Sequence, residues 1–207
     1  DVPNISTLIE RARREGTCTN PGDRISLNSS ATANSQKTPA WKVGVDAAQS
    51  LRACLQPNVH EIISNRLLAD SYGAPASILD ARAVSPSLDL SLSLTESNKQ
   101  NRVLLRSKWE TGRRFELARL LGDEVVYATN DSMRPATRSS TYRQKVQRAF
   151  AAELLSPFRA VDEMLGGDYS MESQQDAAHH FGVSTLTIST LLANHSRISR
   201  DELDGVY

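Results

Sequence analysis

The sequence predicts an α+β fold that is mainly helical and includes a small antiparallel sheet. In most of the chain, apolar residues recur every three or four positions, which is typical of amphipathic helices. Residues 88–94 (LDLSLSL) instead alternate strictly between leucine and a polar residue, which predicts a half-buried strand. A turn at residues 96–100 and a short apolar run at 103–105 follow, so the two strands should form a hairpin.

The N-terminal region should contain one helix and a linker. One helical face of residues 5–15 carries the apolar side chains Ile5, Leu8, Ile9 and Ala12. Residues 16–39 are rich in Ser, Thr, Asn, Gly and Pro, a composition that predicts a flexible linker. We therefore assign residues 1–39 to an N-terminal helix and a flexible linker.

Two helices should connect the linker to the sheet. Residues 40–56 are amphipathic and are followed by Pro57, and residues 58–72 are followed by Gly73. Proline cannot continue a helix, and glycine is the preferred residue just after a helix end.

Five more helices should follow the sheet. Ser170 and Ser184 stand where N-caps of the last two would be. The predicted ranges are 111–122, 138–155, 157–165, 171–181 and 184–194.

Charge is distributed unevenly along a chain whose formal net charge is zero. Residues 99–160 hold 13 Lys or Arg against 6 Asp or Glu, whereas residues 161–207 hold 2 against 8. The centre is therefore basic and the tail acidic. A basic centre keeps a phosphate ligand or a nucleic acid open as an alternative partner.

Cysteine usage and hydropathy favour a cytoplasmic protein. Cys18 and Cys54 are far apart and lack CxxC spacing, which favours reduced thiols. No apolar run approaches the roughly 20 residues of a membrane helix, and the polar start is unlike a signal peptide. The chain does not begin with Met, which suggests a trimmed chain or the C-terminal part of a longer protein.

Residues 113–123 (RRFELARLLGD) resemble the active-site helix of the ImmA/IrrE family of zinc peptidases, which reads roughly R-F-x-L-A-H-E-L-G-H. The resemblance places Arg119 and Asp123 at the two zinc-binding histidines and Leu120 at the general-base glutamate. A guanidinium keeps its proton and does not bind metal, and a leucine cannot transfer protons. The retained frame residues are Arg114, Phe115, Leu117, Ala118, Leu121 and Gly122.

Residues 146–157 (VQRAFAAELLSP) resemble the later helix of the same family, roughly E-A-N-x-F-A-A-x-L-L-x-P. Its leading glutamate, the third zinc ligand, corresponds here to Val146. Residues 41–52 and 177–184 resemble the family's first helix and its helix-turn-helix-like end. The resemblance implies a degenerate peptidase-like domain over residues 40–167, with a C-terminal helix-turn-helix-like segment, residues 168–207, packed on it.

Because all three ligand positions and the general base are replaced, the resemblance implies a catalytically inactive relative without a cofactor. Such a protein would act as a protein-binding or regulatory module. Active members of the family cleave repressors, so a repressor-like regulator is the implied partner, and the former cleft is the expected binding surface. The alternatives are a nucleic-acid or phosphate-ligand binder through the basic centre, or an enzyme with repurposed non-zinc chemistry, which would need a buried acid or nucleophile close to Arg119.

The replaced positions suggest specific contacts. Arg119 and Asp123 are spaced i, i+4 on one helix, so we expect a salt bridge across the former metal site. The alternative is two solvated surface charges. We expect Leu120 and Val146 to fill the space left by the metal, because protein interiors do not keep voids, rather than to line a pocket.

Basic residues on the two helices that flank the family's cleft are candidates for anion or partner binding. The alternative is a solvated basic face. The set consists of Arg113, Arg114, Arg119, Arg143, Lys145 and Arg148.

The helix-turn-helix-like end is not expected to read DNA. The second helix, residues 184–194, contains neither Arg nor Lys, the side chains that contact phosphates and guanine edges. The pair of helices should complete the core or dock a partner.

Overall fold

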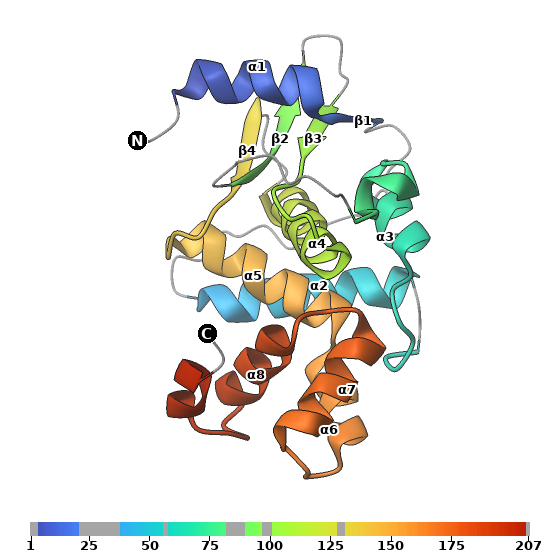
Figure 1. Ribbon diagram of the computed structural model, residues 1–207, viewed down its shortest axis with the longest axis vertical. Coiled ribbons are helices and arrows are strands. Elements are labelled where there is room, and N and C mark those ends of the chain that lie inside the picture. Colours follow the sequence, from blue (N-terminus) through green and yellow to red (C-terminus); the bar gives the residue numbers. More distant parts are fainter. Residues whose placement is uncertain are drawn as a thin grey trace.

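A four-stranded antiparallel sheet lies between one N-terminal helix and a group of helices in this computed structural model (Figure 1). The structure describes residues 4–20, 38–55, 58–81, 90–96, 101–127 and 131–205. Most of the predicted linker, the helix stop at Pro57, the first two residues of the 88–94 strand and most of the predicted hairpin turn lie outside these ranges. Within them, no helix has the length and apolar character needed to cross a membrane.

The predicted α+β class is confirmed. The helices are α1 (Ile5–Glu15), α2 (Ala40–Leu55), α3 (Asn65–Tyr72), α4 (Glu110–Tyr127), α5 (Tyr142–Leu155), α6 (Phe158–Leu165), α7 (Met171–Phe181) and α8 (Thr185–Asn194), with short 3-10 turns η2 (Ala76–Leu79) and η3 (Arg200–Gly205). The strands β1 (Thr17–Thr19), β2 (Ser91–Thr95), β3 (Asn101–Leu104) and β4 (Met133–Ala136) lie in the order β1-β3-β2-β4.

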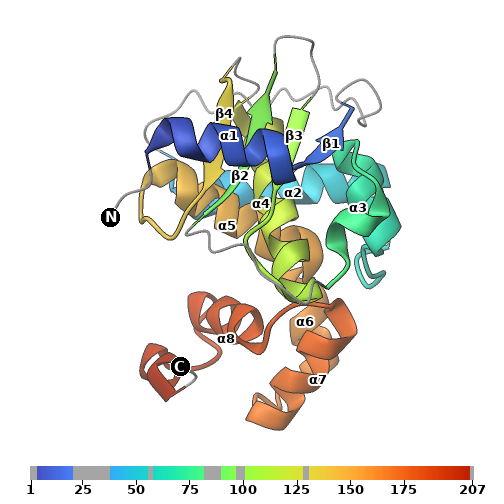
Figure 2. The same cartoon turned by 45° about the horizontal axis from the view of Figure 1, so that its top comes forward.

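Both faces of the sheet are covered. Helix α1 runs across the outer face (Figure 2), where Leu8 and Ala12 pack with Leu92 and Leu94. Helix α4 packs against β2 and β4, so the alternating serines of β2 are buried as well. The strand predicted from the leucine–serine alternation is present. The prediction that it is only half-buried is wrong, because α4 covers the face that carries the serines.

Three further differences concern short segments. Residues 17–19, predicted as linker, form edge strand β1, which pairs with Asn101 to Val103 of β3. Strand β4 was not predicted. The helix expected over 58–72 begins only at Asn65, because Ser64 accepts a hydrogen bond from Leu67 N and caps it there.

Helices α2, α4 and α5 pack closely through two glycines. A Cβ at Gly44 of α2 would come within 2.8 Å of Ala149 Cβ and the Phe150 backbone nitrogen of α5. A Cβ at Gly122 of α4 would come within 2.5 Å of the Phe150 ring. The absence of side chains at these two positions sets how closely α5 approaches its neighbours.

The C-terminal helices α6, α7 and α8 group at the end of the molecule opposite α1 (Figure 2). Ser170 and Ser184 cap α7 and α8, as predicted, and Gly182 turns the chain between them in a left-handed conformation. Phe181 and Ile188 belong to the same core as residues of α2, α4 and α5.

Candidate functional site

The four positions singled out in the sequence, Arg119, Leu120, Asp123 and Val146, lie where α4 and α5 pack together, near β4. Leu120 of α4 and Val146 of α5 are both fully buried in the main core. This agrees with the expectation that they fill space rather than line a pocket.

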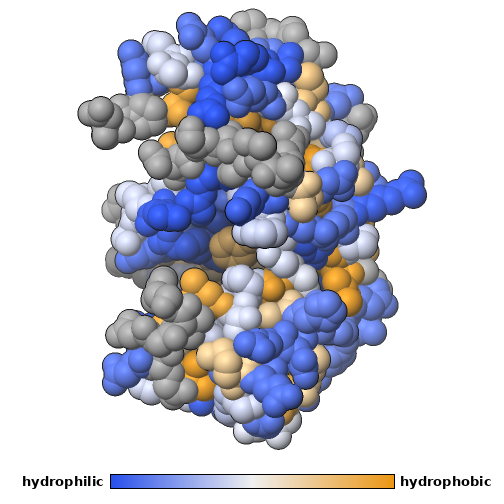
Figure 3. Space-filling view, in the orientation of Figure 1, coloured by the Kyte–Doolittle hydropathy of each residue, from blue (hydrophilic) through white to orange (hydrophobic). Residues whose placement is uncertain are grey.

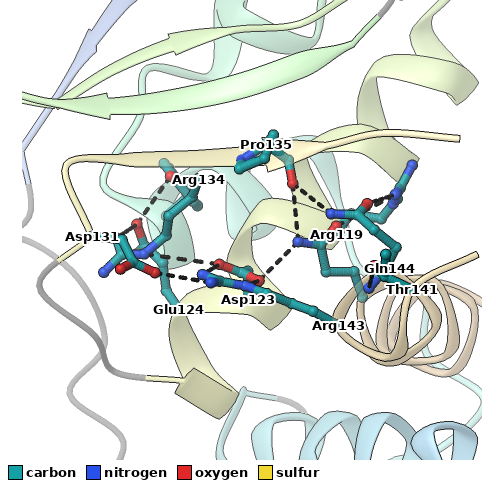
Figure 4. A network of polar contacts seen from close by, with 11 residues as sticks. Arg119, Asp123, Glu124, Asp131, Arg134, Pro135, Thr141, Arg143 and Gln144 are labelled. Carbon is teal, nitrogen blue, oxygen red and sulfur yellow. Dashed lines mark hydrogen bonds and ion pairs between the residues drawn. The ribbon is translucent and has the colours of Figure 1, made fainter. Parts of the chain in front are cut away.

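Asp123 is fully buried and is held by α5 (Figure 4). Its Oδ1 accepts hydrogen bonds from Arg143 Nε at 2.7 Å and from Gln147 Nε2 at 2.8 Å. Its Oδ2 accepts from Arg143 Nη2 at 2.5 Å. The predicted salt bridge between Arg119 and Asp123 is therefore wrong, because Arg143 approaches this carboxylate in a bidentate manner from the neighbouring helix.

Arg143 connects the buried carboxylate to the surface. Its Nη1 donates to Asp131 Oδ2 at 2.9 Å, and its guanidinium lies 5.0 Å from the centre of the Tyr127 ring. The hydrogen bonds to Asp123 raise the pKa of Arg143 above its ordinary value. The arginine is therefore charged at neutral pH.

Arg119 turns away from Asp123 toward the segment that joins β4 to α5. Its Nη2 donates to Thr137 O at 2.7 Å, to Gln144 Oε1 at 2.6 Å and, more weakly, to Gln147 Oε1 at 3.4 Å. Burial lowers the pKa of Arg119 to about 10, with a further contribution from Arg148. The side chain is therefore still protonated at neutral pH, without a carboxylate partner among the described residues.

Two glutamines join the helices to the edge strand. Pro135 O of β4 accepts from Gln144 Nε2 at 2.9 Å and from Gln147 Nε2 at 3.2 Å. Neither glutamine was predicted as a site residue. Gln144 and Gln147 are spaced i, i+3, and Arg143 and Gln147 are spaced i, i+4, a pattern that could have indicated a shared polar face of the helix. We refer to Arg119, Asp123, Arg143, Gln144 and Gln147 as the buried polar network.

Arg134 of β4 lies close to two neighbouring acids of α4, Asp123 and Glu124. Arg134 Nη1 donates to Glu124 Oε1 at 3.0 Å, and Arg134 Nε lies 3.9 Å from Asp123 Oδ2. Tyr72 of α3 also donates to Glu124 Oε1 at 3.1 Å. Asp123 and Glu124 are thus neutralised from β4 and α5.

Two of the predicted anion-binding residues are buried structural supports. Arg113 donates to Ile78 O through Nε at 2.8 Å and Nη2 at 2.5 Å, and to Ser107 O at 2.9 Å. Arg114 donates to Ile63 O at 2.7 Å and Gly182 O at 3.0 Å. The prediction that they cradle an anion is wrong, because backbone carbonyls occupy their donors.

The rest of the basic set behaves differently. Arg143 is committed to Asp123 and Asp131, and Lys145 lies exposed on α5. Arg148 is half-buried and donates to Ser139 O at 3.0 Å. The structure therefore does not bring the six basic residues together in one cleft.

In the described ranges, no three His, Cys, Asp or Glu side chains gather as a metal ion would require. Gln147, the residue after Val146, contacts both Arg119 and Asp123.

Comparisons with known proteins give no relative. No family model matches the chain, no curated protein matches it significantly, and neither does any solved structure.

Proposed function

We propose that this chain is a catalytically inactive module of the ImmA/IrrE peptidase type that acts by binding a protein, with a repressor-like regulator as the partner class. The observation that carries the proposal is that Asp123, at a zinc-ligand position, is fully buried and has both carboxylate oxygens bound by α5.

Chemistry at the four replaced positions is disfavoured by their side chains. Arg119 is protonated, and Leu120 and Val146 are aliphatic and enclosed. The buried acids nearest Arg119 are Asp123, which is paired with Arg143, and Glu116, which accepts from Ser107 N at 2.9 Å and from Arg106. An enzyme with repurposed chemistry would need an uncommitted acid or nucleophile here, so it is the weaker alternative.

A partner would have to contact residues outside the former cleft, contrary to our sequence-based expectation, because Arg119 is only 8% exposed and the other three positions are fully enclosed. Trp41 and Tyr142 are better suited. They are 59% and 43% exposed, at the first turns of α2 and α5, and Tyr142 Oη donates to Thr38 O at 2.8 Å. Exposed aromatic residues of this kind commonly dominate binding energies.

Figure 3 shows how hydrophilic and hydrophobic residues are distributed on one face of the molecule. Hydrophilic residues cover its middle, and hydrophobic residues gather in its lower half, over the C-terminal helices. A partner that contacts the first turns of α2 and α5 would meet two exposed aromatic residues, Trp41 and Tyr142, which belong to the residue types enriched at protein interfaces.

Two measurements test the proposal. The full chain should not cleave a mixture of fluorogenic peptides with or without added zinc, and cross-linking in cells that produce it should capture a partner. Trp41→Ser should weaken that complex by about 2 kcal/mol or more, whereas Trp109→Ser, at a tryptophan 64% exposed near the start of α4, should leave it unchanged. Zinc-dependent cleavage by the wild-type chain would refute the proposal, and equal effects of the two variants would refute the interface.

A further inference from the structure

Arg119 and Arg148 are two positive charges that converge on one turn without an acidic partner. Arg119 donates to Thr137 O at 2.7 Å, and Arg148 donates to Ser139 O at 3.0 Å. The hydroxyls of Thr137 and Ser139 are themselves 2.9 Å apart. Neither arginine has an ion pair in the part of the chain that the structure describes, and carbonyl oxygens do not neutralise a full charge.

The donors of Arg119 are incompletely used. All of its hydrogen bonds come from Nη2, which has only two hydrogens. Nε is buried without a partner, and Nη1 donates to no described residue and is not among the enclosed atoms. A buried guanidinium with unused donors and no ion pair among the described residues is costly, so the turn that its Nη2 contacts is a favourable place for an anion.

The turn also leads into the N-terminus of α5, a helix of 14 residues. Thr141 caps this helix by accepting from Gln144 N at 3.4 Å. The N–H groups of Ser140 and Tyr142 have no acceptor within the described ranges. Free N–H groups and the helix dipole both favour negative charge at this end.

The two acids that act electrostatically on Arg119, Glu116 and Asp123, are both bound by other donors. Glu116 lies one turn before Arg119 on α4, but its oxygens accept from Ser107 N at 2.9 Å and from Arg106 Nε at 3.3 Å. The positive charges of Arg119 and Arg148 therefore face the turn together.

We propose that the turn from Thr137 to Tyr142, with Arg119 beneath it and Arg148 beside it, binds a phosphate dianion, either inorganic phosphate or the phosphate of a monoester. Two guanidinium charges match a dianion, and their N–H groups suit phosphate oxygens. Hydroxyls of the turn and N–H groups of the helix start supply further donors. This site does not depend on the proposed protein interface and would stand if no protein partner were found.

Calorimetric titration of the full chain at constant ionic strength tests the site. Inorganic phosphate and methyl phosphate are the ligands, with dimethyl phosphate and acetate as monoanionic comparisons. Both dianions should saturate one site per chain. Arg148→Gln should weaken their binding about tenfold to hundredfold, as expected for loss of a hydrogen-bonding charge. Because Arg148 is half-buried and bonds only to Ser139 O, this variant should fold.

The matched control is Arg159→Gln, an exposed arginine whose described partner is Glu163 on the same helix. It should bind both dianions as the wild type does. Equal binding by Arg148→Gln and wild type would overturn the site, as would equal losses in the two variants. Dimethyl phosphate binding as tightly as methyl phosphate would overturn the monoester assignment in favour of a nucleic-acid backbone. Absence of saturable binding by either dianion would overturn the proposal altogether.

Discussion

Asp123 is the buried centre of the contact between α4 and α5. Arg143 donates two hydrogen bonds to its carboxylate, at 2.7 and 2.5 Å, and Gln147 donates a third. A buried charge is tolerated only when it is paired and hydrogen-bonded in this way. The stability of the α4–α5 contact should therefore depend on Arg143 more than on any surface arginine.

Arg143→Met should lower the free energy of unfolding by about 3 kcal/mol, because it leaves the Asp123 charge buried with weaker partners. Arg159→Met removes an exposed i, i+4 pair with Glu163 and should cost under about 1 kcal/mol. Urea unfolding of both variants at neutral pH measures the difference. Equal losses would mean that the network contributes no more than a surface ion pair.

At the residue scale, the sequence predicted the important positions more successfully than it predicted the residues that they contact. The i, i+4 spacing of Arg119 and Asp123 correctly placed both near one helical face. It could not show that Arg143 and Gln147 of another helix would lie closer to Asp123. Partner choice is a tertiary property, and the pattern of one helix does not contain it.

At the scale of elements, the packing of α2 against α5 depends on Gly44. A methyl group there would meet Val146 O at 2.5 Å and Phe150 N at 2.8 Å. These neighbours are backbone atoms, so no rotamer change relieves the clash. An added methyl group can therefore be accommodated only if the two helices move apart.

Gly44→Ala should destabilise the protein by about 2 kcal/mol or more, although alanine is the better helix former by about 1 kcal/mol. Ser50→Ala, at an exposed position of the same helix, should stay within about 0.5 kcal/mol of the wild type. Thermal melts of both variants measure the change in stability relative to the wild type. A Gly44→Ala variant as stable as the wild type would show that the helices can separate freely.

Helices were predicted better than short strands, although α4 extends to Tyr127 instead of residue 122 and α5 begins at Tyr142 instead of residue 138. Helices α1, α7 and α8 lie within one residue of their predicted ranges. Strand β1 has three residues in a polar context and β4 contains Pro135, so neither gave an alternating apolar pattern. Both are edge strands that form by pairing with the predicted hairpin, which is information from outside their own sequence.

At the scale of the whole molecule, Arg114 ties the C-terminal helices to the rest. It donates to Ile63 O before α3 and to Gly182 O between α7 and α8. The sequence marked Arg114 only as a retained frame residue and a candidate anion ligand. Its structural role became visible once helices distant in sequence were packed together.

Arg114→Ala should therefore loosen α7 and α8 more than the sheet. We expect amide exchange over residues 171–194 to accelerate about tenfold or more, because two backbone carbonyls lose a charged hydrogen-bond donor. A tenfold faster exchange corresponds to a loss of about 1.4 kcal/mol in local stability. Hydrogen-exchange mass spectrometry of the wild type and the variant measures it. Uniform acceleration across the sheet and the helices would contradict a local role for Arg114.

Zinc stoichiometry tests the central proposal, an inactive site in a peptidase-like frame, most directly. The wild-type chain is compared with a variant carrying Arg119→His, Leu120→Glu, Asp123→His and Gln147→Glu, because Gln147 contacts both ligand positions of α4. A control carries Val146→Glu in place of Gln147→Glu. We predict no bound zinc in the wild type, one zinc per chain in the variant, and weaker binding in the control. One zinc per wild-type chain would contradict the inactive site, and a folded variant without zinc would contradict the peptidase-like frame.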